Sequence, residues 1–217
     1  MDISWFGHAC FRLRDRDVSV VTDPFDASLG YALPKLQADI VTISHDHPHH
    51  SHLAAVIGDF RVLDSPGEYE IRSIFITGIA TYPPQRAAAE GSQHHERNVI
   101  FIFEFDSLTV CHLGDLRQVP SQAQVEALGE VDVLLVPVGG GEHGSLNASQ
   151  AAEVVSLVEP SIVIPMHYRT DATTINMDGV DKFLKEMGVG RIEPVDNLKV
   201  TATSLPQPTQ VVVLSPR

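Results

Sequence analysis

Histidine, the commonest metal ligand among side chains, is concentrated in one short stretch of this sequence. The stretch contains His45, His47, His49, His50 and His52. The apolar run over residues 40–43 predicts a buried strand just before it, and Pro48 prevents that strand from continuing. Because a rigid strand end can aim several imidazoles at one point, the stretch predicts a metal site. A solvated histidine-rich loop is the alternative, although such tracts are usually terminal and this one is internal.

Two further strand ends carry residues suited to the same chemistry. The predicted strand over 108–111 runs into His112 and Asp115, and the predicted strand over 161–165 ends at His167. Zinc takes histidine and carboxylate ligands, and in catalytic sites it keeps one position for water. The metal lowers the pKa of that water to about 7, which makes hydroxide available at neutral pH. These residue types therefore indicate metal-dependent hydrolysis.

Five short motifs occur in an order that is typical of one superfamily. They are Trp5-Phe6-Gly7-His8, Thr22-Asp23-Pro24, His45-x-His47-x-His49-His50, His112-Leu113-Gly114-Asp115 and Pro165-Met166-His167-Tyr168. Together they resemble the metallo-β-lactamase superfamily, whose His-x-His-x-Asp-His signature is similar to the third motif. The resemblance covers nearly the whole chain. It is greatest to the small bacterial and archaeal branch that includes the ascorbate-6-phosphate lactonase-like hydrolases.

The resemblance implies a set of metal ligands: His45, His47, His49, His50, Asp115 and His167. By the family pattern, His45 and His47 hold a first metal. His50 and His167 hold a second metal, and Asp115 bridges the two. We take Asp115 and His49 as the candidate catalytic residues. The expected cofactor is Zn²⁺, as one or two ions, with Mn²⁺ or Fe²⁺ as other choices.

The sequence departs from the family pattern at two places. Position 49 is an aspartate in the family, and His49 exchanges that anionic oxygen ligand for a neutral nitrogen. The family's further histidine for the first metal would fall near residues 82–84, where the sequence is Tyr-Pro-Pro. Either His94 or His95 supplies it, or the first metal is weak or absent. A site with fewer carboxylates is more positive and should bind anionic groups more readily.

Four more residues are expected around the ligands, as second-layer or substrate contacts: His8, Asp23, Asp46 and His112. His8 interrupts the first predicted strand, where a purely structural histidine is the alternative. The resemblance suggests that the carboxylate of Asp23 steadies the histidine stretch, and an Asx turn is the alternative. His143, beside the glycine run at 139–141, either lines the pocket or is an exposed loop residue.

The elements that must position these residues are groups of strands with single helices between them. Strands are predicted over 3–13, 18–22, 40–43, 61–63, 71–79, 98–105, 108–111, 131–138, 161–165, 200–203 and 210–214. Helices are predicted over 53–57, 121–128, 148–158 and 177–187. This grouping favours a sheet-rich α+β (αβ/βα) core. The resemblance sharpens it to one domain over 1–217, a four-layer sandwich of two packed mixed β-sheets with helices on both outer faces.

Composition limits the expected partners and location. The formal net charge is −13, from 15 basic and 28 acidic residues, so a nucleic-acid partner is not expected and a small-molecule substrate is. No apolar run reaches the roughly 20 residues of a membrane helix, and residues 1–4 lack the features of a signal peptide. Cys10 and Cys111 are expected to be buried free thiols, without a disulfide framework. We therefore expect a soluble cytoplasmic protein, with its oligomeric state left open.

Three classes of function are considered for this sequence. The first is a hydrolase in which a metal-bound hydroxide attacks an ester, lactone, phosphodiester or amide of a small molecule. The second is a catalytically altered or inactive member, with a partial metal site, that acts as a binding or sensor protein. The two departures from the family pattern motivate this second class. Redox chemistry at a di-iron site, known in larger relatives of similar fold, is a third.

Overall fold

The computed structural model of the protein describes residues 1–83, 97–141 and 144–217. Three candidate residues, His94, His95 and His143, lie outside the described residues. None of the helices within these ranges has the length and apolar character needed to span a bilayer.

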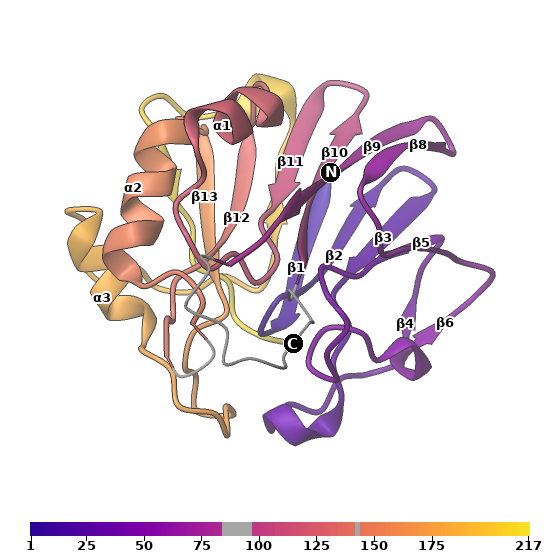
Figure 1. Ribbon diagram of the computed structural model, residues 1–217, viewed down its shortest axis with the longest axis horizontal. Helices are drawn as coiled ribbons and strands as arrows, with labels where there is room; N and C mark the ends of the chain where they lie inside the picture. The colour runs from indigo at the N-terminus through magenta and orange to yellow at the C-terminus, as the bar shows by residue number, and fades with distance from the viewer. Residues whose placement is uncertain (84–96, 142–143) are drawn as a thin grey trace, which may run out of the picture.

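Two β-sheets pack against each other in the described part of the chain (Figure 1). The first has the strand order β14-β1-β2-β3-β5-β7. Its strands are β1 (Asp2–Gly7), β2 (Cys10–Asp15), β3 (Val18–Thr22), β5 (Ile40–Thr42), β7 (Arg61–Leu63) and β14 (Leu198–Lys199). The second has the order β15-β13-β12-β11-β10-β9-β8. Its strands are β8 (Gly67–Ile71), β9 (Ile74–Thr81), β10 (Asn98–Phe105), β11 (Leu108–His112), β12 (Val133–Pro137), β13 (Ile162–Met166) and β15 (Gln210–Val211).

The core between the sheets is built from large side chains of both. Trp5 and Phe11 of the first sheet and Phe101 and Phe103 of the second are fully buried in one cluster. Every residue of β12 and β13 is buried, as expected of continuous apolar runs in strands covered on both faces. Both sheets contain parallel and antiparallel pairs. The predicted sandwich of two packed mixed sheets is therefore confirmed.

The outer faces of the two sheets are covered in different ways. Side chains alternate along a strand, so Phe6 points away from Trp5 and packs in a second cluster with Phe25, Leu29 and Tyr31. These three residues come from the segment between β3 and β5. The helices are α1 (Gln122–Leu128), α2 (Ala148–Val158) and α3 (Val180–Glu186), and Figure 1 shows them together on the side of β12 and β13. The placement of helices on both outer faces stays a prediction.

The first predicted strand and the first predicted helix are wrong. Residues 3–13 form two strands because Gly7 (φ +108°) and His8 (φ +50°) adopt left-handed backbone, which turns the chain into the β1–β2 hairpin. Residues 53–57 do not form a helix. A 3₁₀ turn at Leu53–Ala55 is followed by β6 (Val56–Ile57), whose β-branched residues pair with β4 (Leu36–Gln37).

Two later boundaries also differ from the prediction. The strand predicted over 71–79 is interrupted, because β8 pairs antiparallel with β9 and the chain reverses at Arg72 and Ser73, both with left-handed backbone. The closing strand predicted over 200–203 is wrong. β14 ends at Lys199, and a 3₁₀ turn at Ala202–Ser204 follows, held by the reciprocal hydrogen bonds of its capping box.

Parallel pairing brings the strand ends that carry candidate residues to one edge. β3 and β5 are parallel, and so are β11, β12 and β13. Ligand sites of open sheets lie beyond the carboxyl ends of such strands. Here β3 runs into Asp23 and β5 into the histidine stretch, while β11 leads to Asp115 and β13 to His167. The fold thus places four sequence-distant segments beside one another.

Gly114, between β11 and Asp115, gives the first testable prediction. Its φ is +62°, and a Cβ there would lie 2.4 Å from Asn98 Oδ1 and 2.5 Å from Ser44 Cβ. We expect Gly114→Ala to lower the free energy of unfolding by about 2–4 kcal/mol, through backbone strain and overpacking, as measured by urea denaturation. Gly188→Ala is the matched control, because Gly188 has φ +68° with no heavy atom within 4 Å. Equal losses in the two variants would contradict the steric argument.

Candidate metal centre

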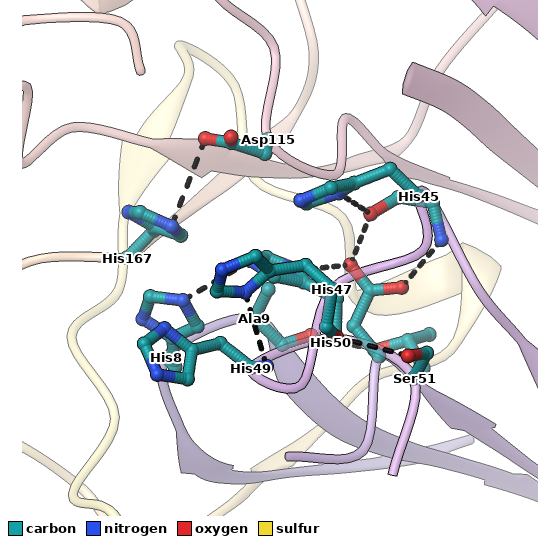
Figure 2. Close-up of polar contacts among 12 residues, drawn as sticks. His8, Ala9, His45, His47, His49, His50, Ser51, Asp115 and His167 are labelled. Carbon is teal, nitrogen blue, oxygen red and sulfur yellow. Dashed lines mark hydrogen bonds and ion pairs between the residues drawn. The ribbon is translucent and has the colours of Figure 1, made fainter. Parts of the chain in front are cut away.

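One small cavity at this edge collects the candidate ligands (Figure 2). Its volume is about 30 Å³, which suits a small ion or a water molecule. Its walls are formed by His8, His45, His47, His49, His50, Asp115, Arg117, His167 and Ile175. All six ligands implied by the family resemblance therefore line the same cavity.

His50 is oriented by the buried carboxylate of Asp23. His50 Nδ1 lies 2.9 Å from Asp23 Oδ2. The same carboxylate accepts the Ser44 backbone N–H at 2.7 Å and the Ser44 hydroxyl at 2.6 Å. Because a carboxylate only accepts, His50 carries its proton on Nδ1 and keeps the Nε2 lone pair. A carboxylate behind a histidine in this way fixes the ring for metal binding.

Burial and hydrogen bonding set the charges of this pair. Burial would raise the pKa of Asp23, but the hydrogen bond and charge of His50, together with His112 and Ser44, outweigh it and lower the pKa to about 2. Burial lowers the pKa of His50 to about 4, despite the opposing effect of Asp23. At neutral pH the pair is therefore an ionised carboxylate and a neutral imidazole, and neutral imidazole is the form that binds metals.

His8 completes a buried cluster with His50 and His167. His8 Nε2 lies 3.1 Å from His50 Nε2, and the His8 and His167 rings are 3.8 Å apart between centroids. The carbonyl of His8 accepts the backbone N–H of His167 and the Trp5 indole N–H, each at 3.0 Å. The first of these bonds ties the β1–β2 turn to the end of β13, and the second lies within the hairpin. Burial, with the neighbouring histidines, lowers the pKa of His8 well below its usual value.

His167 is held by Ser145, which also binds Asp115. Ser145 Oγ donates to Asp115 Oδ1 and lies 3.4 Å from His167 Nδ1. Since the hydroxyl proton is used, His167 donates from Nδ1 and keeps the Nε2 lone pair, 3.7 Å from Asp115 Oδ1. Burial would raise the pKa of Asp115, but His167, His50, Ser145 and Arg117 together lower it.

His45 and His47 differ in which ring nitrogen carries the proton. His45 Nδ1 lies 3.1 Å from Ser44 Oγ, whose own proton goes to Asp23, so His45 donates from Nδ1 and its Nε2 is bare. His47 Nδ1 instead accepts the backbone N–H of His49 at 3.2 Å. Neutral His47 therefore carries its proton on Nε2 in this arrangement, and its role as a metal ligand stays a prediction.

His49 has its proton fixed by a short chain of hydrogen bonds. Its Nε2 lies 3.0 Å from Ser28 Oγ, and this hydroxyl donates to Asp26 Oδ1. Ser28 must therefore accept from His49, so His49 Nε2 is protonated. Of the three histidines on this side of the cavity, His45 is the one that presents a bare Nε2.

The cluster of His8, His50 and His167 fits a divalent metal. Ring nitrogens of the three residues lie within 4.8 Å of one another, and all three side chains are buried. Nitrogens bound tetrahedrally to zinc at about 2.0–2.1 Å are about 3.3 Å apart. The 3.1 Å between His8 Nε2 and His50 Nε2 is close to this separation. Without a metal, the bare Nε2 of His50 accepts the Nε2–H of His8, which leaves His8 Nδ1 as a buried lone pair without a hydrogen-bond partner in the described structure. A cation is a strong partner for such a lone pair.

The residues expected around the ligands occupy different places. Asp23 contacts His50, whereas His8 belongs to the cluster itself. His112 is fully buried outside the cavity, and its Nε2 donates to Ala9 O at 2.9 Å. Asp46 is exposed and accepts a hydrogen bond from Ser51 at 3.2 Å. Cys10 and Cys111 are buried free thiols, as expected.

Sequence reasoning missed two residues that bind Asp115. Arg117 donates to Asp115 Oδ2 from Nε at 3.2 Å and from Nη2 at 3.1 Å. Because Arg117 lies two residues after Asp115, at the same strand end, the sequence could have indicated that it is close to the site. Ser145 comes from the segment between β12 and α2, and no local pattern links it to Asp115.

The carboxylate behind His50 gives the second prediction. We expect Asp23→Asn to lower zinc affinity about 10–100-fold, because the variant loses the charge that holds the His50 proton on Nδ1. Competition with a chromophoric chelator measures the affinity. Asp26→Asn is the matched control, since Asp26 acts on His49 through Ser28 and should leave the affinity nearly unchanged. Equal losses in both variants would refute the assignment of His50 as the ligand.

The buried neutral histidines give the third prediction, for the chelated, metal-free protein. The pKa of His50 is about 4 in the folded protein and 6.5 for the free side chain. Between pH 4 and pH 6.5 the unfolded state therefore binds more protons than the folded state. The free energy of unfolding should therefore fall by about 1.4 kcal/mol per pH unit as the pH drops through this window, about 3 kcal/mol in total for this group. Urea denaturation between about pH 8 and pH 4 measures it. Constant stability across that range would contradict the neutral state of His50.

The sequence of this chain is similar to a known domain family and to several known proteins. Residues 2–167 match the model of the β-lactamase superfamily domain. The UPF0173 protein of Pyrococcus furiosus is 31% identical over 205 residues, which cover 88% of this chain and 93% of that protein. The UPF0173 metal-dependent hydrolase of Thermoplasma acidophilum is 27% identical, over 78% of this chain and 84% of that one.

A solved structure extends the likeness to three dimensions. A crystal structure from Thermotoga maritima, described as a candidate Zn-dependent hydrolase of the metallo-β-lactamase superfamily, is 41% identical to this chain. The two superpose with a TM-score of 0.80, over 98% of this chain and 97% of that one. The resemblance carried by the five sequence motifs is thus confirmed, and the chain belongs to the metallo-β-lactamase superfamily.

Proposed function

We propose that this protein is a metal-dependent hydrolase of a small molecule. The observation that carries the proposal is the convergence of His8, His50 and His167 on one buried point, with the outer ring nitrogens of His50 and His167 held by Asp23 and Ser145. Relatives named as metal-dependent hydrolases support the same class. The bond cleaved is an ester, lactone, phosphodiester or amide, because each of these is attacked at a carbon or phosphorus that a metal can polarise.

The resident metal is zinc, because three neutral imidazole ligands bind zinc more strongly than they bind Mg²⁺ or Ca²⁺. Mn²⁺ and Fe²⁺ are the other candidates. When bound, the metal would supply a hydroxide from water at neutral pH and polarise the scissile group. His8, His50 and His167 would hold it. Asp23 would keep the proton of His50 on Nδ1, so that the lone pair of Nε2 stays available.

The remaining wall residues have distinct roles toward the substrate. Asp115 is ionised at neutral pH because its pKa is lowered, so it orients water by accepting a hydrogen bond and takes up a proton poorly. His47 presents an N–H at Nε2, which can donate to the leaving group. His49, whose Nε2 proton is held by Ser28, is a wall residue in this scheme and not a metal ligand.

The alternative of an altered, non-catalytic member is not favoured, because the three-histidine cluster is buried and supported from behind. The net charge of −13 supports a small molecule over a nucleic acid as the partner. The two free thiols support a reducing compartment such as the cytoplasm.

The fourth prediction tests the proposed activity. Zinc-loaded protein should hydrolyse at least one member of a panel of p-nitrophenyl esters, lactones, phosphodiesters and amides, and a chelator should abolish the reaction. His167→Ala should lower kcat/KM by about 100-fold or more, since loss of a ligand exceeds the 10–100-fold cost of losing a residue behind it. His52→Ala is the control, because His52 belongs to the same stretch but is exposed and outside the cavity wall.

Activity that survives chelation, or equal activity in His167→Ala and His52→Ala, would refute metal-dependent hydrolysis at this centre. Zinc binding without turnover of any substrate in the panel would favour the binding or sensor role instead.

A further inference from the structure

Asp115 has both of its carboxylate oxygens engaged by protein groups. Ser145 Oγ donates to Oδ1, and Arg117 donates to Oδ2 at 3.1 and 3.2 Å. The side chain of Asp115 is 4% exposed and that of Arg117 is 22% exposed, so the ion pair is largely shielded from water. Hydrogen bonds between two charged groups are among the strongest in proteins. The arginine therefore holds the carboxylate tightly.

Arg117 is also part of the cavity wall, together with the histidines. A guanidinium stays protonated at every pH at which the protein is folded. A fixed cation beside Asp115 repels a metal ion that approaches the same carboxylate, and this repulsion is strong where water is scarce. A metal on the His45 side of the cavity would have to displace Arg117 to use Asp115 as a ligand.

The His45 side is also short of other ligands. Nδ1 of His47 accepts the backbone N–H of His49, and Nε2 of His49 donates to Ser28, so one nitrogen of each ring is already hydrogen-bonded within the protein. Across the described ranges, the one group of metal-ligating side chains close enough to hold an ion consists of His8, His50 and His167.

We propose that this protein uses one metal ion, on His8, His50 and His167, and that Arg117 supplies the second positive charge of the site. The proposal rests on the metal dependence proposed above. Asp115 then serves as the anion that anchors the guanidinium, with Ser145 as its second partner. The guanidinium lies in the wall of the cavity where hydrolysis places negative charge on the substrate, which a fixed cation stabilises without reorganisation.

The test counts the zinc ions bound by the full chain in zinc-buffered titrations, by calorimetry and elemental analysis. Wild-type protein should bind one ion per chain. Arg117→Ala should bind a second, weaker ion, because Asp115 is released to act with His45. Arg117→Lys should still bind one ion, since the cation is retained. The double variant Arg117→Ala with His45→Ala should again bind one ion, which would show that His45 is a ligand of the second ion.

Matched controls separate these effects from misfolding. Arg191→Ala removes an arginine whose side chain is 86% exposed and paired with Glu193, and it should bind one ion. Arg117→Gln, which removes the positive charge but keeps more of the side-chain volume, replaces Arg117→Ala if that variant does not fold, and it should also gain the second ion. Melting curves establish folding for each variant.

Two ions on the wild-type chain would overturn the proposal. If His94→Ala with His95→Ala then reduced two ions to one, the second site would belong to those histidines, and the proposal would equally fail. A single ion on Arg117→Ala, at zinc concentrations far above the dissociation constant of the first site, would also overturn it. No ion on the wild-type chain would instead refute the metal dependence itself, so the two failures are distinguishable.

Discussion

The carboxylate of Asp23 is the group on which the geometry of this site depends. It is fully buried, yet it accepts three hydrogen bonds, two from Ser44 and one from His50. Burying an anion costs several kcal/mol unless it is compensated in this way. The three bonds join the end of β3 to the histidine stretch after β5. They also decide that the His50 proton lies on Nδ1, and therefore that its Nε2 points at the cavity as a lone pair.

Three residues with left-handed backbone lie at the same edge. His8, Asp23 and His167 have φ of +50°, +38° and +53°, a region that costs non-glycine residues of order 1–2 kcal/mol each. Backbone hydrogen bonds hold these conformations: Asp23 N–H donates to Thr42 O at 2.9 Å and His167 N–H to His8 O at 3.0 Å. Such strained residues cluster at functional sites. Here the strain turns three chain segments sharply at their strand ends, so that their side chains meet.

Two of the cavity's histidines and the Asp115–Arg117 pair add no net charge to the cavity without a metal. Burial keeps His8 and His50 neutral, and the carboxylate of Asp115 is matched by the guanidinium of Arg117. A bound divalent ion would then make the cavity positive within a chain whose net charge is −13. A local positive charge on an acidic surface favours small anionic groups and disfavours large polyanions. Anion binding, expected from His49 in place of an acidic residue, stays a prediction.

Local patterns determined what could be read from the chain alone. The apolar runs over 98–105, 131–138 and 161–165 became buried strands, and the histidines after 40–43 arrived at a strand end, because burial and backbone preference are encoded within a few residues. The tertiary structure alone decided that His8 joins the cluster, since a left-handed turn after Gly7 carries it across to the end of β13. It also decided that Ser145 and Arg117 bind Asp115, and which nitrogen of each histidine keeps its proton. Those properties depend on partners far away in the sequence, and only the packing of the two sheets brings such partners within hydrogen-bonding distance.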